Sequence, residues 1–143
     1  MIIKGLRTLS IYDLEAIKKI IAYIDRSYAK QITAQDLCSR FNIAKNELNL
    51  GMKQATGFSL HPYITRKRID IAKYLLAFEP NISIKEVSEQ VGFKNVSSFG
   101  AAFKEICHET PRDYKRRKTA TTIRNVNYLD TSIDHKQTFS SSV

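Results

Sequence analysis

Two clusters of polar side chains, about 50 residues apart, have the residue types that hydrogen-bond to the edges of base pairs. The first lies in a helical stretch at about 44–55 and the second in one at about 95–107. An asparagine amide both donates and accepts, so it can pair with an adenine edge in the major groove, and a leucine can contact a thymine methyl group. The candidate base-contacting residues are Lys45, Asn46, Glu47, Asn49 and Leu50 in the first stretch and Asn95, Val96, Ser97, Ser98 and Ala101 in the second.

Basic side chains near both clusters are candidates for contacts with backbone phosphates. The chain of 143 residues has 23 Lys and Arg against 14 Asp and Glu, which gives a formal charge of +9. Residues 119–143 hold two basic and two acidic residues, so the whole excess lies within 1–118. An excess of this kind favours polyanions, with nucleic acid first and an anionic membrane surface second. The candidate phosphate-contacting residues are Lys53, Arg66, Lys94, Lys104 and Arg112.

Enzymatic chemistry has no comparable constellation in this sequence. His61, His108 and His135 lie on separate segments, and none has a metal-ligand spacing with Cys38 or Cys107. The adjacent serines of the second cluster lack the nearby base and strained turn that a nucleophile requires. No glycine-rich phosphate loop is present. We therefore predict a protein that is not an enzyme, with no catalytic residue, no metal, no cofactor and no small-molecule ligand.

The composition also bears on location. No apolar run approaches the roughly 20 residues that a membrane span requires, and the N-terminus lacks the apolar core of a signal peptide. Two cysteines are too few for a disulfide framework, which favours a reduced cytoplasm. We therefore expect a cytoplasmic protein that does not contact membranes.

Both polar clusters belong to an internal repeat. Residues 32–63 are similar to residues 82–114, first at an offset of 50 and then of 51. Equivalent core positions recur, as in the pair of Met52 and Phe103. Each copy is typical of a short helix, a turn and a second helix, and the second helix has an apolar face that seats it and a polar face left exposed. Two such units in tandem, on a basic chain, indicate a reader of two successive stretches of DNA groove.

The apolar periodicity predicts an all-α fold with no strand. Thr33 with Asp36, Ser83 with Glu86, and Asn95 are predicted helix caps. Helices are expected at about 10–29, 33–42, 44–55, 60–78, 83–92 and 95–107, followed by a short last helix that opens at 110–111, seven in all. The first helix is expected to bury Leu14, Ile17, Ile20, Ile21, Ile24 and Tyr28, and the long fourth helix to bury Ile64, Ile71, Ala72, Leu75 and Leu76.

The same pattern divides the chain into segments. Residues 1–10 are expected to be an N-terminal stump or linker, and 11–118 a DNA-binding domain. Residues 119–143 hold nine Ser or Thr and no helical period, which predicts a disordered tail. Within the domain, the first helix-turn-helix is placed at about 33–56, the linker helix at about 60–78 and the second helix-turn-helix at about 83–107.

The residues of the linker helix and the second unit resemble the C-terminal DNA-binding domain of the AraC/XylS family of bacterial transcription regulators. The match covers about 11–118. It rests on Tyr63-Ile64-x-x-x-Arg68-Ile69-x-x-Ala72-x-x-Leu75-Leu76, on Val91-Gly92-Phe93, on Ser98-Phe99-x-x-x-Phe103-Lys104, and on Thr110-Pro111-x-x-Tyr114-Lys115.

This resemblance implies a fold and a mode of action. Two homeodomain-like helix-turn-helix subdomains would be joined by the long helix, with recognition helices in neighbouring major grooves of double-stranded DNA about 34 Å apart, one helical turn. Most members of the family activate transcription by contacting RNA polymerase, so the polymerase is an expected partner and the bacterial nucleoid an expected location.

Some positions depart from the family pattern. Leu50 and Ala101 stand where relatives often carry arginine, and His108 replaces the glycine that usually ends its helix. Gly51 lies inside a predicted helix, where glycine costs about 1 kcal/mol relative to alanine. These departures affect which DNA sequence is read.

A non-catalytic basic module that binds RNA or an anionic surface is the alternative. Readers of single-stranded RNA usually expose aromatic side chains on which bases stack. The aromatic residues Phe41, Phe93, Phe99 and Phe103 instead have the spacing of a core. The sequence therefore favours duplex DNA.

Overall fold

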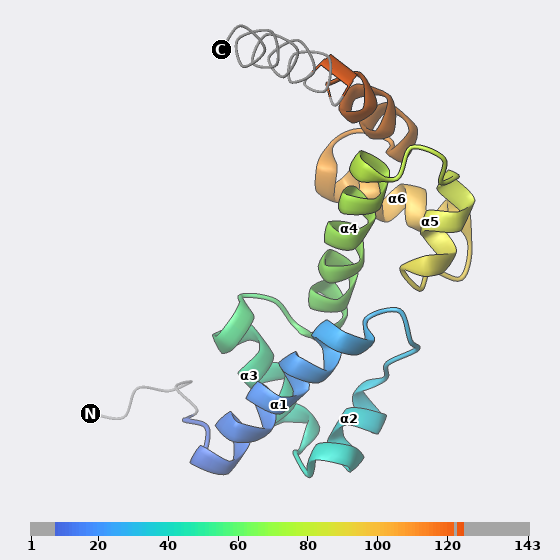
Figure 1. Cartoon of the computed structure of the whole chain (residues 1–143). Coiled ribbons are helices and arrows are strands. Elements are labelled where there is room, and N and C mark those ends of the chain that lie inside the picture. The colour runs from blue at the N-terminus through green and yellow to red at the C-terminus, as the bar shows by residue number, and fades with distance from the viewer. Residues whose placement is uncertain (1–7, 122, 125–143) are drawn as a thin grey trace, which may run out of the picture. The chain divides into compact units, whose positions relative to one another are not determined.

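The computed structural model describes residues 8–121, 123 and 124, and its regular secondary structure there is entirely helical. The predicted all-α class with seven helices is confirmed for this described part. The chain divides into two compact units, residues 1–70 and 71–143, and each is described by itself. The helices, coloured along the chain in Figure 1, are α1 (Ile11–Ser27), α2 (Ala34–Phe41), α3 (Lys45–Thr56), α4 (Leu60–Phe78), α5 (Ile84–Gln90), α6 (Val96–Cys107) and a last helix at residues 111–121.

Side-chain caps fix the starts of the helices in the first unit. The Ser10 hydroxyl accepts a hydrogen bond from the Asp13 backbone N–H at 3.1 Å. Thr33 accepts from the Asp36 N–H at 3.1 Å, as predicted from the sequence. Each bond satisfies a backbone donor that has no partner inside the helix. At the other end of α3, Gly57 adopts a left-handed conformation with φ of 83°, which ends the helix.

The core of the first unit lies between α1, α2 and α3. Ile20 and Ile24 of α1 are fully buried with Leu37 of α2 and with Leu48 and Met52 of α3. Three predictions for α1 are wrong in degree. Leu14 is 50% exposed and Ile21 is half-buried, because both lie at the edge of the apolar face and border a groove between α1 and α3. Tyr28, also predicted to be buried, is half-buried.

The long helix buries a slightly different face from the predicted one. Ile64 is buried in the first unit, and Ala72 and Leu76 are fully buried in the second. The predicted Ile71 and Leu75 are only half-buried. Residues 72 and 76 are one helical turn apart, so they share a face, and their neighbours one position before lie on its flank.

Local hydrogen bonds define the helices of the second unit as well. Ser83 and Glu86 form the predicted capping box, with reciprocal bonds of 3.0 and 2.9 Å at the start of α5. The side-chain oxygen of Asn95 accepts from the Ser98 N–H at 2.7 Å and begins α6. The two predicted caps are confirmed.

A series of aromatic rings forms the core of the second unit. The ring centroids of Phe93 and Phe99 are 5.4 Å apart, those of Phe99 and Phe103 are 5.8 Å apart, and those of Phe103 and Tyr114 are 5.4 Å apart. Tilted and edge-on contacts at these distances are favourable beyond the burial of the rings. The series joins the turn before α6, α6 itself and the last helix.

The last helix is longer than the sequence predicted. Thr110 accepts from the Asp113 N–H at 3.1 Å and opens the helix with Pro111 in its first turn. The helix continues past Lys118 to residue 121, and residues 123 and 124 are helical as well. No glycine or proline follows to stop it. The rest of the predicted tail, residues 122 and 125–143, lies outside the described residues, as do residues 1–7.

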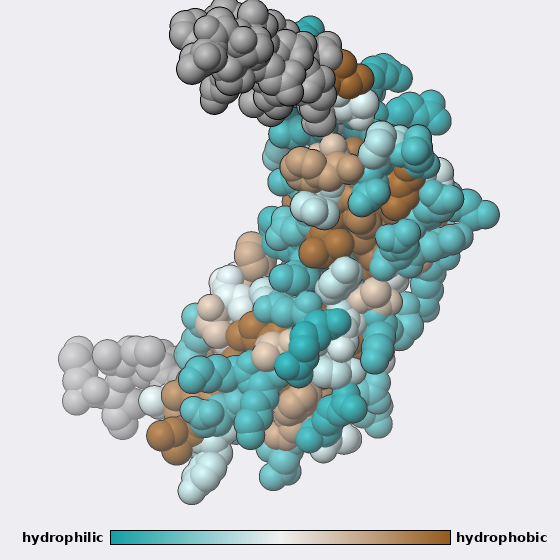
Figure 2. Space-filling view, viewed as in Figure 1, coloured by the Kyte–Doolittle hydropathy of each residue, from teal (hydrophilic) through white to brown (hydrophobic). Residues whose placement is uncertain are grey.

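Hydrophilic residues cover most of the face that Figure 2 shows on both units. Within the described ranges, no helix combines the length and the apolar character that crossing a bilayer requires.

Candidate nucleic-acid interface

The first helix-turn-helix consists of α2, a three-residue turn and α3. Asn42 in the turn takes the left-handed conformation, with φ of 51°. The next residue, Ile43, is buried, and its N–H donates to the Cys38 carbonyl at 3.2 Å. Asparagine is one of the few residues that adopt this conformation at low cost. The turn therefore ties α3 to α2, while Leu48 and Met52 seat α3 in the core.

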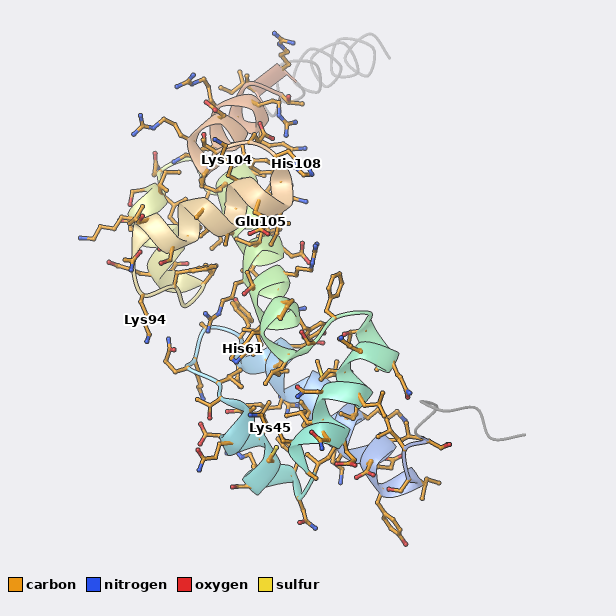
Figure 3. All side chains as sticks on the ribbon, turned by 180° about the vertical axis from the view of Figure 1, so that it is seen from behind. Lys45, His61, Lys94, Lys104, Glu105 and His108 are labelled. Atoms are coloured by element: carbon orange, nitrogen blue, oxygen red, sulfur yellow. The ribbon has the colours of Figure 1, made fainter. Side chains whose placement is uncertain are left out.

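The predicted DNA-contacting side chains of α3 lie on the face opposite that core. Lys45, Asn46, Asn49 and Lys53 are exposed, and Figure 3 labels Lys45 at the start of the helix. Leu50, the candidate for contact with a thymine methyl group, is half-buried, and so is Glu47. Part of the Leu50 side chain is thus still available for an apolar contact.

Gly51 has a role that sequence reasoning missed. It is buried, and a Cβ built on it would lie 2.6 Å from Ile17 Cδ1 and closer still to Ile17 Cγ1. Leu9 Cδ1 would be 3.3 Å away. The absence of a side chain lets the backbone of α3 approach α1 closely. The glycine that weakens the helix locally therefore permits its packing against α1.

Arg66, a predicted phosphate contact, is exposed on α4. Its guanidinium carbon lies 4.3 Å from the centroid of the Phe58 ring. A cation over an aromatic face is weakly attracted to it, so the ring restrains the guanidinium while leaving its N–H groups accessible.

Two side chains of the family-like linker motif attach α4 to α1. Arg68 donates from Nε to the Tyr28 carbonyl at 2.7 Å and from Nη2 to the Lys30 carbonyl at 2.9 Å. Tyr28 is the C-cap of α1, where helices leave carbonyls without internal partners, and Lys30 lies in the turn that follows. Partial burial lowers the pKa of Arg68, but an arginine stays charged at neutral pH.

Tyr63 makes the second attachment. Its hydroxyl donates to Asp25 Oδ1 at 2.9 Å, and Lys67 Nζ lies 3.5 Å from the same oxygen. Burial, followed by the hydrogen bond to the Asp25 carboxylate and its negative charge, raises the pKa of Tyr63 to about 12. The motif quoted from the sequence gave no reason for this tyrosine, because its partner lies 38 residues away.

The second helix-turn-helix is held by α5. Val87 and Val91 are fully buried, and Gly92 adopts φ of 98° in the turn. Ser88, also buried, donates from its hydroxyl to the Asn95 carbonyl at 3.3 Å. The Ser88 hydroxyl thereby connects α5 to Asn95, the N-cap residue of α6.

The outer face of α6 is exposed over its whole length. Its accessible residues are small, apart from Val96, which is 41% exposed, Lys104 and Glu105. The side-chain oxygen of Asn95 is engaged by the helix cap, so its amide N–H groups remain for other contacts. Lys94 points away from the turn in Figure 3. The other predicted contacts, Ser97, Ser98, Ala101 and Arg112, are exposed as well.

In the described part of the chain, no group of three or more His, Cys, Asp or Glu is arranged to hold a metal ion. Cys38 and Cys107 are not joined by a disulfide. The candidate site consists of two helix faces, on α3 and α6, with polar and basic side chains. The opposite face of each helix packs into a core through buried apolar side chains.

Comparison with known proteins decides the family. A family model described as a helix-turn-helix domain, of the AraC/XylS type, matches residues 37–117, more than half of the chain. The chain belongs to this family. Its members regulate transcription by binding DNA, and this chain is a DNA-binding domain of that kind.

Curated relatives of this AraC/XylS-type domain are longer proteins. The probable transcriptional regulator LumQ of Photobacterium leiognathi is 30% identical over 114 residues, which cover 76% of this chain and 46% of the relative. The Msm operon regulatory protein of Streptococcus mutans is 29% identical over 100 residues, 70% of this chain and 34% of the relative. The chain thus spans less than half the length of these two relatives.

Solved structures share the fold. The C-terminal domain of the two-component response regulator yesN from Fusobacterium nucleatum subsp. nucleatum is 30% identical, with a TM-score of 0.65, over 71% of this chain and 98% of that domain. The DNA-binding domain of AdpA, solved in complex with a target DNA, is 18% identical with a TM-score of 0.70, over 74% of this chain and 95% of that domain. At that identity the likeness to AdpA concerns the fold alone.

Proposed function

We propose that this chain reads a specific sequence of double-stranded DNA by placing α3 and α6 in adjacent major grooves. The observation that carries the proposal is that each of these helices is seated by fully buried side chains and leaves an outer face with exposed polar and basic side chains. An α-helix fits the major groove, which is about 12 Å wide. Each helix-turn-helix, at about 33–56 and about 83–107, supplies one such reader, and α4 connects them.

The residues divide into two roles. Asn46 and Asn49 would read bases on the first helix, with Lys45, Glu47 and the accessible part of Leu50 beside them. On α6, the small residues 95–98 and Ala101 would allow close approach of the backbone and reading of groove shape. The basic residues would neutralise phosphates and supply most of the affinity, without reading sequence. The phosphate contacts are Lys53, Arg66, Lys94, Lys104 and Arg112.

The protein would act without catalysis, in the bacterial cytoplasm on the nucleoid, and would activate transcription by contacting RNA polymerase. Membership of the AraC/XylS-type family supports these assignments. A bridging assay would test the polymerase contact. Purified polymerase should bind a promoter more tightly when this chain occupies its site, and equal binding with and without the chain would refute it.

Selection of bound sequences from a random duplex library, followed by footprinting, tests the reading of DNA. We expect one enriched motif with two conserved segments about ten base pairs apart, centre to centre, the length of one helical turn. Enrichment of no motif, or of a single segment, would contradict the two-groove proposal.

An RNA-binding module is the second candidate, and one observation favours it. Tyr74 and Phe78 of α4 are 59% and 61% exposed, and their ring centroids lie 5.0 Å apart. Exposed aromatic rings are the usual stacking platforms for single-stranded bases. Competition between duplex DNA, single-stranded RNA and anionic vesicles at matched charge separates the two functions. RNA as the preferred ligand, with the preference lost in Tyr74→Ser, would establish the second.

A further inference from the structure

The last helix carries far more positive charge than its packing requires. Between residues 111 and 124 there are six basic side chains and a single acidic one, Asp113. A charged helix face is often simply solvated. The contacts that each basic side chain makes within the protein show which of them are available to a partner. The basic residues are Arg112, Lys115, Arg116, Arg117, Lys118 and Arg124.

Three of the six have structural roles. Lys115 Nζ donates to the Ile82 carbonyl and ties the helix to the loop before α5. Arg117 forms an ion pair with Glu109. Arg117 and Lys118 also lie over the Tyr114 ring, at 5.3 and 5.7 Å from its centroid. These three side chains therefore each contact another group of the protein.

The remaining three form what we call the C-terminal arginine face: Arg112, Arg116 and Arg124. All three are exposed. The Arg116 side chain is 75% exposed, and its only ion pair in the described part of the chain is a 4.0 Å contact with Asp113. An exposed pair of this kind contributes little to stability. Arg112 and Arg116 are four positions apart, so they lie on the same side of the helix.

This face has a fixed relation to the second recognition helix. Pro111 is buried, Tyr114 is 7% exposed, and the Tyr114 ring packs against Phe103 of α6. Lys104, a proposed phosphate contact, lies near the end of α6 from which the chain turns into the last helix (Figure 3). The last helix is therefore packed against α6, which places its charge beside the proposed DNA-reading surface.

We propose that the C-terminal arginine face binds phosphates of the DNA that flanks the segment read by α6. The proposal rests on the proposed function and adds Arg116 and Arg124 to its contacts. Arginine matches phosphate geometry with two parallel hydrogen bonds, which makes it well suited to this contact. Arg112 and Arg116 lie one turn apart, roughly 6 Å along the helix at about 1.5 Å per residue. That length is close to the rise of about two base pairs.

The test compares two double variants of the full chain with equal loss of charge. Arg116→Gln/Arg124→Gln removes the outer part of the face. Lys18→Gln/Lys19→Gln removes two exposed charges of α1, which no proposed contact uses. Affinity for the selected duplex, with ten further base pairs on the α6 side, is measured from low to high salt. Circular dichroism checks that both variants keep the helix content and melting temperature of the wild type.

We expect the slope of log affinity against log salt to flatten by about 1.8 in the arginine variant, since each phosphate contact contributes about 0.9. The lysine variant should keep the wild-type slope. On a duplex cut at the edge of the α6 segment, the arginine variant and the wild type should have equal slopes. Arg116→Lys/Arg124→Lys should retain most of the slope, because the charge is kept.

Equal flattening in both double variants would show a general charge effect and overturn the inference, and so would no flattening in the arginine variant. Loss of binding to anionic vesicles or RNA, with unchanged binding to duplex, would assign the face to another partner and also overturn it. Failure of the proposed function is separately visible, because the wild type itself would then show no preference for the selected duplex.

Discussion

Replacing Gly51 by alanine tests whether close packing, rather than helix propensity, decides this position. From propensity alone the change should stabilise α3 by about 1 kcal/mol. The added methyl, however, would lie 2.6 Å from Ile17 Cδ1 and closer to Ile17 Cγ1, distances that real Cβ atoms do not show. Ile17 is 3% exposed, so it has little room to move. Overpacking of a core typically costs 1–3 kcal/mol.

We therefore expect Gly51→Ala to lower the free energy of unfolding by about 1–2 kcal/mol, with the packing cost near the upper end of its range. In a unit of this size that corresponds to a fall in Tm of roughly 5–10 °C. The measurement is thermal unfolding followed by circular dichroism at 222 nm, with urea unfolding as a second method. Because Gly51 belongs to residues 1–70, only the transition of that unit should shift.

Gly100 is a matched control on α6. It also lies inside a helix, but a Cβ built on it meets nothing within 4 Å. Gly100→Ala should therefore stabilise the second unit by about 0.5–1 kcal/mol. A double-mutant cycle adds a second check: in an Ile17→Ala background, which removes both clashing atoms, Gly51→Ala should become neutral or stabilising. If Gly51→Ala stabilises the protein as much as Gly100→Ala does, the packing argument is wrong.

Three further predictions concern the DNA contacts and the attachment of α4. Lys53→Ala and Lys104→Ala should each flatten the log-affinity against log-salt slope by about 0.9, and an unchanged slope in both would refute these phosphate contacts. Asn49→Ala should cost about 1–3 kcal/mol on the selected site and relax discrimination at one base pair, whereas an equal loss on random DNA would make it a positioning contact. The raised pKa of Tyr63 means that the unfolded chain loses this proton first, so its stabilising effect is present below about pH 10 and is lost between about pH 10 and 12. Tyr63→Phe should therefore lose less stability than the wild type across that window in urea unfolding, and parallel pH profiles would contradict this assignment.

The parts of the fold that depend on local chemistry could be predicted from the sequence. Thr33, Ser83, Asn95 and Thr110 each cap a helix three residues before the backbone N–H that they bind, a spacing visible in one stretch of chain. The apolar period likewise placed Met52 of α3 and Phe99 and Phe103 of α6 in the core, where all three are fully buried. It was less accurate at the edges of such stripes, as with Leu14, because partial exposure depends on how far the neighbouring helix extends.

The contacts that were missed depend on distances between segments far apart in the chain. Gly51 looked like a local weakness because its benefit appears only where α3 meets Ile17 of α1. Arg68 binds backbone carbonyls 38 and 40 residues earlier, and carbonyls leave no mark in a sequence. Apart from Leu50 and Glu47, which are half-buried, the predicted DNA-contacting residues of α3 and α6 are exposed, and their roles toward DNA remain predictions.

The most direct test of the two-groove account is binding to the selected duplex with five base pairs inserted between its two conserved segments. Half a helical turn would place the second segment on the opposite side of the DNA, out of reach of the second recognition helix. The account predicts that affinity falls to that of a duplex bearing the first segment alone. Affinity unchanged by the insertion would contradict the claim that α3 and α6 of one chain read adjacent turns together.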